Sequence, residues 1–208
     1  MMLPPKEGFM FRTILGALPL VLIAGATTAE AHGLHASLSD LVRQSDRIVV
    51  AKVEGIQSAF EEHTVAVRDG QPITGKFVFT YVEIRPTEHI VGAPTETITV
   101  RLLGGVHPGG SAITTYLDAP SLSSAEAVLL FLEQVPERGP DNQTVHQIAF
   151  HRAGKFRVEG EGTDASVVRS LPNAELKIDP REEIGAGPID LSRMRTLIQS
   201  ERAARGRD

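Results

Sequence analysis

The histidines have the widest chemical range of any residues in this chain of 208 residues, which contains seven of them. His32 directly follows the segment Ala-Glu-Ala at residues 29–31, and His35 lies three residues further on. If the chain is cut after Ala31, His32 becomes the first residue, and its free α-amine and imidazole form a bidentate nitrogen chelate suited to Cu(II), to which His35 adds a third nitrogen. A copper or other metal site at His32 and His35 is therefore one alternative, against the ordinary interpretation of a polar, fraying tail.

Other candidate groups give weaker patterns. His146 and His151 are five positions apart, and an odd separation places them on opposite faces of a strand, so we expect no shared metal. Residues 61–63, Glu-Glu-His, lack the second histidine of a zinc-protease motif. Ser111 follows two glycines and lies four residues after His107, so a hydrolase built on this pair is a second alternative, although the G-x-S-x-G elbow is absent. We predict no catalytic residue and no cofactor, and expect that the protein is not an enzyme.

The N-terminal segment predicts export. Lys6 and Arg12 precede an apolar run at residues 14–24, which is shorter than the roughly 20 residues of a membrane span but suits the core of a signal peptide. The small residues at 29 and 31 then fit signal-peptidase cleavage, so we predict a cleavable signal peptide over residues 1–31. The chain has no cysteine, which excludes a disulfide, a thiolate metal site and a lipid-modified N-terminal cysteine. We expect a soluble periplasmic or secreted protein that is not a lipoprotein and has no membrane span after cleavage.

The composition limits the classes of binding partner to be expected. The formal net charge is −5, and the chain has two tyrosines and no tryptophan. A nucleic-acid binder normally carries a basic face or aromatic platforms for bases, so we expect no nucleic-acid partner. An unknown protein or a small ligand in the cell envelope or medium is the expected partner.

The periodicity after the leader predicts a mainly β domain. Ser37 and Asp40 form a capping-box pattern that predicts a short helix. Alternation of apolar and polar residues, or a short apolar run, then predicts five main strands. These are residues 47–55, 77–84, 97–103, 128–132 and 144–150, with 154–158 continuing or pairing with the last and a short edge strand at 167–168.

The segments between the strands complete the predicted organisation. Residues 57–75 are polar and predict a loop, and Pro86 is expected to end the second strand. Residues 104–124 form a connection rich in Gly, Pro and Ser, long enough to predict a functional role. We therefore predict a small five-stranded barrel over residues 32–171, a linker at 172–189, and a C-terminal helix and tail at 190–208.

The order of these motifs resembles that of netrin-like modules, including tissue inhibitors of metalloproteinases, and of a group of uncharacterised bacterial exported proteins. The resemblance rests on residues 45–53, 81–84, 90–92, 98–102, 126–132 and 154–158. It implies an OB-type, five-stranded barrel with a short N-terminal and a C-terminal helix. The inhibitors chelate zinc through an N-terminal cysteine, and this chain has none, so that mechanism does not carry over. The resulting expectation is an exported, non-enzymatic binding or interaction module that uses the 104–124 connection.

Overall fold

The computed structural model describes residues 36–68, 71–110, 112–116, 119–169 and 187–205, without the side chains of residues 64–68 and 72–73. The chain divides into two units, Met1–Ala31 and His32–Asp208, and all described residues belong to the second. The predicted signal peptide lies outside the described residues, as does most of the predicted linker.

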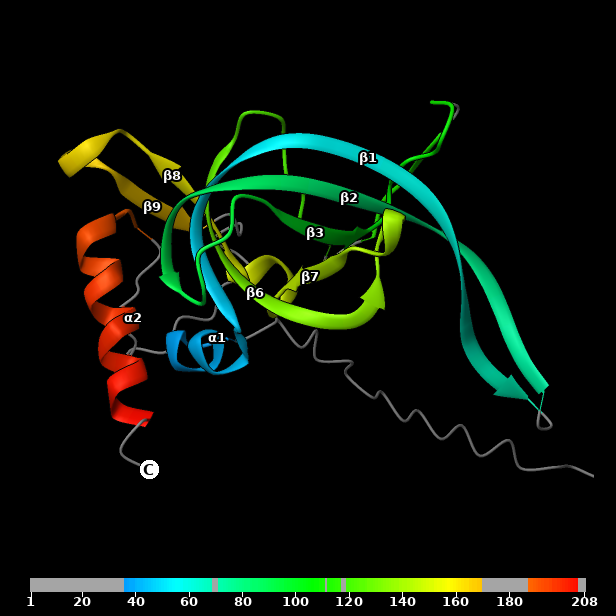
Figure 1. Cartoon of the computed structure of the whole chain (residues 1–208), viewed down its shortest axis with the longest axis horizontal. Coiled ribbons are helices and arrows are strands. Elements are labelled where there is room, and N and C mark those ends of the chain that lie inside the picture. The colour runs from blue at the N-terminus through cyan, green and yellow to red at the C-terminus, as the bar shows by residue number, and fades with distance from the viewer. Residues whose placement is uncertain (1–35, 69–70, 111, 117–118, 170–186, 206–208) are drawn as a thin grey trace, which may run out of the picture. The chain divides into compact units, whose positions relative to one another are not determined.

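The described chain is mainly β, with one short helix before the strands and one helix after them (Figure 1). Helix α1 (Leu38–Gln44) begins at the predicted capping box, in which the Ser37 hydroxyl accepts the Asp40 backbone N–H at 3.1 Å and Asp40 reaches back to the Ser37 backbone N–H. Helix α2 (Leu191–Arg205) confirms the predicted C-terminal helix. Neither helix combines the length and apolar character needed to cross a membrane within the described part of the chain.

Eight strands form one sheet, so the expectation of five is wrong as a strand count. Its order is β1-β2-β3-β7-β6-β8-β9-β10, and β1 also pairs with β6. The strands are β1 (Arg47–Arg68), β2 (Gln71–Val91), β3 (Ile98–Leu103), β6 (Ala127–Arg138), β7 (Thr144–Ile148), β8 (Lys155–Glu159), β9 (Ser166–Arg169) and β10 (Ile189–Asp190). Two further strands, β4 (Gly105–Val106) and β5 (Ile113–Thr114), pair only with each other. Single 3₁₀ turns occur at Pro140–Asn142, His151–Gly154 and Gly162–Asp164.

The largest departure from the sequence prediction is the β1–β2 ribbon, which curves across the sheet as two strands lying side by side (Figure 1). Residues 57–75, predicted as a loop, belong almost entirely to these strands. They can do so without a buried face, because β1 and β2 satisfy each other's backbone hydrogen bonds. Pro86 does not end β2: it lies opposite Ala51, next to an irregularity in register that accommodates a residue without an N–H. The 154–158 strand pairs with β6 and β9, and not with β7.

Two apolar layers cover opposite faces of β1 and β6. Ile48 and Phe131 face the layer that includes both helices, whereas Val49 and Leu130 face a second layer with β2 and β3. The apolar run 128–132 is therefore buried on both sides, as predicted, and β1 is buried on both sides over residues 48–51 instead of on one side. The helices contribute Leu38, Leu41, Val42, Leu191, Met194 and Ile198 to the first layer.

Candidate functional site

The long connection after β3 turns away from the sheet at two glycines with positive φ. Gly104 donates its N–H to the Val78 carbonyl at 2.8 Å and accepts the Thr80 hydroxyl at 2.6 Å, which fixes the connection against β2. Gly105 has a φ of +130°, and a Cβ atom there would lie 1.9 Å from the Thr80 hydroxyl oxygen. Only glycine fits this close approach, so the direction of the connection is set where β3 ends.

Strands β4 and β5 make the first half of the connection a small hairpin. His107 donates its backbone N–H to the Ala112 carbonyl at 2.8 Å and accepts the Gly110 N–H at 2.8 Å. The His107 ring contacts Thr114 Oγ1 at 2.7 Å through Nε2 and meets the Phe60 ring edge-on, with centroids 5.3 Å apart. These contacts hold the hairpin against β1.

The returning half of the connection is tied to the segments after β7. The Arg152 Nε–H donates to the Ala119 carbonyl at 3.2 Å, and Lys155 Nζ donates to the Ser121 carbonyl. Lys155 also pairs with Glu126 at 2.8 Å, and both side chains are largely buried, at 7% and 16% exposure. The connection is therefore anchored at both ends.

A cavity of about 620 Å³ lies between this connection and the sheet, and we call it the loop pocket. Its walls include Ile56 and Thr80 from the ribbon, Leu102 from β3 and Arg152 from the turn after β7. The described residues contain five exposed large apolar side chains: Ile56, Leu103, Val106 and Ile113, which line the loop pocket, and Phe60, which contacts His107 beside it. Ile113 is the most exposed, at 69%. Single exposed apolar residues are ordinary, but their concentration at one concave site is typical of a binding site.

A second cavity, of about 400 Å³, shares one wall with the loop pocket. The shared wall consists of Leu102, Leu103, Tyr116, Ala119 and Pro120. The second cavity continues to Phe79 and Arg101, on the other face of the ribbon.

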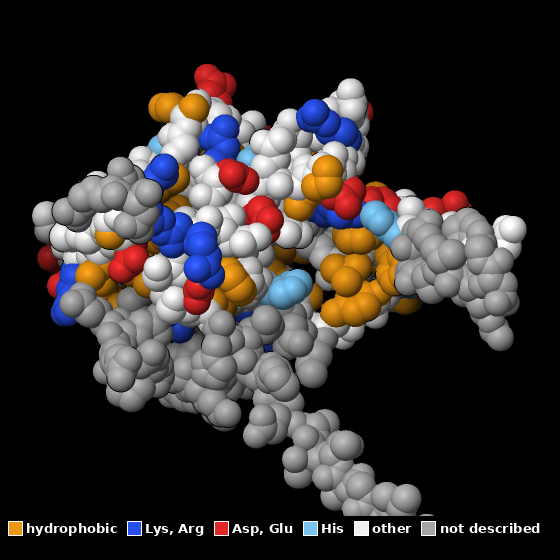
Figure 2. Space-filling model, turned by 90° about the horizontal axis from the view of Figure 1, so that it is seen from below, with side chains coloured by type: hydrophobic (Ala, Val, Ile, Leu, Met, Phe, Trp, Pro, Cys, Tyr) orange, Lys and Arg blue, Asp and Glu red, His pale blue; other side chains and the backbone are white. Residues whose placement is uncertain are grey.

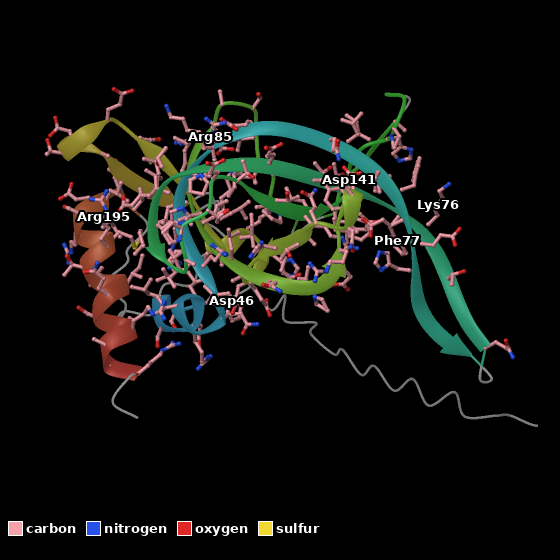
Figure 3. The ribbon with its side chains drawn as sticks, in the orientation of Figure 1. Asp46, Lys76, Phe77, Arg85, Asp141 and Arg195 are labelled. Carbon is pink, nitrogen blue, oxygen red and sulfur yellow. The ribbon has the colours of Figure 1, made fainter. Side chains whose placement is uncertain are left out.

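The two faces of the ribbon differ in chemistry, because successive side chains alternate between them. Figure 3 shows Lys76 and Phe77 on opposite sides of β2. Lys76 lies over the Phe60 ring, 4.7 Å from its centroid, and so belongs to the face of Phe60. Phe77 meets the His63 ring on the other face. Seen from below, in Figure 2, apolar side chains gather in a hollow with histidine at its border.

Glu61, His63, Tyr81 and Arg101 form a polar cluster on the Phe77 face. Arg101 donates through Nη2 to Glu61 Oε2 at 2.6 Å, and its guanidinium lies over the Phe79 ring, 3.7 Å from the centroid. The Tyr81 hydroxyl donates to the other Glu61 oxygen, and His63 Nε2 lies 2.9 Å from Glu61 Oε2. The cluster joins β1, β2 and β3 where the ribbon leaves the sheet.

The pKa values in this cluster follow from burial and hydrogen bonding. Burial raises the pKa of Glu61, but hydrogen bonds from Arg101, Tyr81 and His63 outweigh it and hold the pKa below its ordinary value of 4.5. Burial, followed by the contact with the Glu61 carboxylate, raises the pKa of Tyr81 to about 12. Glu61 is therefore ionised and Tyr81 neutral at pH 7, and the Glu61 carboxylate compensates the charge of Arg101.

Some of the predicted site residues lie outside the described residues, and the structure describes the others. His32, His35 and Ser111 lie outside, so the copper and hydrolase alternatives stay predictions. His107 lines the loop pocket and bonds Thr114. Within the described ranges, no group of three or more His, Asp or Glu side chains is arranged to hold a metal ion.

His146 and His151 are not brought together as a site. His146 is buried on β7, at 5% exposure, whereas His151 is exposed in the turn that follows and lines the second cavity. The expectation placed them on opposite faces of one strand, but β7 ends at Ile148, before His151.

Sequence reasoning missed Arg101, Arg152 and Lys155. Arg101 and Lys155 alternate with apolar residues in strands, a pattern that predicts solvent exposure. Their side chains are nevertheless only 10% and 7% exposed, because a carboxylate from another strand or loop pairs with each. Arg152 follows His151 in a turn and gives no local signal. These side chains acquire their surroundings from distant parts of the chain.

Scans against protein-family models, curated proteins and solved structures found no match to this chain.

Proposed function

We propose that this protein is an exported, non-enzymatic binding module whose binding site is the loop pocket. The observation that carries the proposal is the position of the exposed apolar side chains: four of the five large ones among the described residues line one cavity of about 620 Å³. A volume in this range suits a small organic molecule. The expected ligand is a small molecule with a substantial apolar surface.

The strand pairing supports an OB-like, netrin-like barrel as the framework of this module. Strands β1, β2, β3, β7 and β6 pair in this order, and β6 returns to β1, so five strands form a closed ring of pairings. In this proposal β8, β9 and β10 extend the barrel beyond β6. The 104–124 connection then joins β3 to β6 and covers the side of the ring.

The apolar leader supports export. We expect the exported protein to begin at His32, as cleavage after Ala31 requires. N-terminal sequencing of protein recovered from the periplasm or medium tests this, and a product that retains residues 1–31 contradicts it.

The binding proposal is tested with a neutral apolar fluorophore, N-phenyl-1-naphthylamine, titrated into the purified protein. We expect saturable fluorescence enhancement, and about tenfold weaker binding in the double variant Val106→Ser, Ile113→Ser, because methyl groups that would cover the probe are lost. Both side chains are exposed, so the variant should fold normally, which circular dichroism checks.

Val168→Ser is the matched control, because Val168 is a half-buried residue of β9 that does not line the loop pocket. It should bind the fluorophore as the wild type does. Failure of the wild type to bind, or equal weakening in the control, contradicts the proposal.

A further inference from the structure

The loop pocket has an asymmetric charge. Among its described lining residues Arg152 is a permanent cation and His107 a titratable base, and no aspartate or glutamate contributes to the walls. The remaining polar side chains in the walls are hydroxyls, of which Thr80 is already occupied with Gly104 and Ser58. A cation in a partly apolar cavity attracts an anionic group where no carboxylate stands among the described lining residues.

Arg152 differs from Arg101 and Lys155, the two other cations beside the connection. Arg101 pairs with Glu61 at 2.6 Å and Lys155 pairs with Glu126 at 2.8 Å. Arg152 forms no ion pair with any carboxylate of the described ranges. Its charge is therefore left uncompensated by the described part of the chain.

The hydrogen bonding of Arg152 leaves the two terminal nitrogens of its guanidinium available. Nε donates to the Ala119 carbonyl, which fixes the guanidinium in the wall beside the returning segment. The two terminal nitrogens make no hydrogen bond to the described residues, and the side chain is half-buried. A guanidinium held through Nε presents its terminal N–H groups to a carboxylate in a planar geometry that the two oxygens match.

The apolar part of the pocket lies on other elements. Ile56 comes from β1, Val106 and Ile113 from the hairpin, and Leu122 from the end of the connection. Glu126 does not line the pocket, and its charge is compensated by Lys155, which also donates to the carbonyl of the lining residue Ser121.

We propose that the loop pocket binds an amphipathic monoanion, an apolar chain bearing one carboxylate, with the carboxylate paired to Arg152 and the chain lying along Ile56, Val106 and Ile113. This inference rests on the proposed binding function and specifies its ligand class. It makes Arg152 the residue that determines head-group specificity.

Three probes with the same ten-carbon chain separate the head group from the tail: decanoate, decan-1-ol and decyltrimethylammonium, each used to displace N-phenyl-1-naphthylamine at pH 8. We expect decanoate to bind at least about tenfold more tightly than decan-1-ol, because a charge-assisted contact contributes about 1.5 kcal/mol or more. Decyltrimethylammonium should bind most weakly. Equal affinity for all three probes in the wild type overturns the inference while leaving the binding function intact, whereas absence of fluorophore binding overturns the binding function itself.

The variant Arg152→Gln tests the residue. It should lose the preference for decanoate over decan-1-ol, whereas Arg152→Lys should keep part of that preference. Arg157→Gln is the control, because Arg157 is exposed, pairs with Glu159 and does not line the pocket. Retention of the full preference in a folded Arg152→Gln protein overturns the assignment, and the wild-type probe series remains decisive if that variant does not fold.

Discussion

The Lys155–Glu126 pair should stabilise both the fold and the loop pocket, and its removal gives the sharpest test of the structure. The Lys155 side chain is 7% exposed, and its ammonium pairs with Glu126 and donates to the Ser121 carbonyl. The variant Lys155→Met keeps most of the apolar stem but leaves the carboxylate of Glu126, whose side chain is 16% exposed, without its cation. Breaking a buried pair in this way costs about 3–5 kcal/mol, so we expect the free energy of unfolding in urea to fall by about 3 kcal/mol.

A double-mutant cycle distinguishes the ion pair from a general packing defect. In Lys155→Met with Glu126→Gln no buried charge remains, so the loss should be smaller than the sum of the two single losses by about 1–3 kcal/mol. The matched control is the pair Arg157→Met and Glu159→Gln, whose ionic groups are 57% and 46% exposed and should contribute less than about 1 kcal/mol. A cost below about 1 kcal/mol for Lys155→Met, or strict additivity in the cycle, refutes this reasoning. The same variant should also weaken fluorophore binding, because Ser121 and Leu122 line the pocket.

Three further perturbations address the rest of the molecule. Because the folded-state pKa of Glu61 lies below 4.5, its stabilisation is present above that pH and lost as pH falls through the folded pKa. Glu61→Gln should therefore cost about 2 kcal/mol at pH 7 and flatten the acid dependence of urea unfolding below pH 4.5. Burial, and then the nearby Arg47, lowers the pKa of His146, so its imidazole resonance should titrate in NMR below 6.5, and its contribution to stability should fall as pH drops below 6.5, where the unfolded chain takes up the proton first. Phe131 is fully buried against Phe156, with centroids 5.8 Å apart, so Phe131→Ala should lower the free energy of unfolding by about 3–5 kcal/mol in the same urea assay.

The sequence predicts well those elements that neighbouring residues determine. Helix α1 follows from the Ser37–Asp40 capping box, which needs only four residues. The run 128–132 in β6 is predicted because five consecutive apolar residues are stable only where both faces of a strand are covered. In both cases the local pattern and the observed burial agree.

The β1–β2 ribbon shows what local patterns cannot predict. The outer part of the ribbon lies beyond the two main apolar layers. Residues 57–62 therefore do not show the alternation of buried apolar and exposed polar residues by which a strand is predicted. The strands are specified by pairing across the hairpin, from Ile48 opposite Val91 to Arg68 opposite Gln71, which is a relation between distant residues. Charge patterns fail for the same reason at Lys155, whose burial depends on a carboxylate 29 positions away.

The loop pocket combines a part that the sequence predicts with a part that it does not. The length and composition of residues 104–124 predict a functional connection, but Ile56 and Arg152 join its lining only through the fold. Ile56 and Ile113 expose apolar surface to water, and they do not belong to either main apolar layer. Apolar surface of this kind contributes to stability only when something covers it, at about 25 cal/mol per Å². A ligand with an apolar chain would bury these side chains, and a carboxylate on it would compensate the charge of Arg152. These two features are the ones that the proposed ligand class accounts for, and the displacement series with decanoate, decan-1-ol and decyltrimethylammonium tests them together.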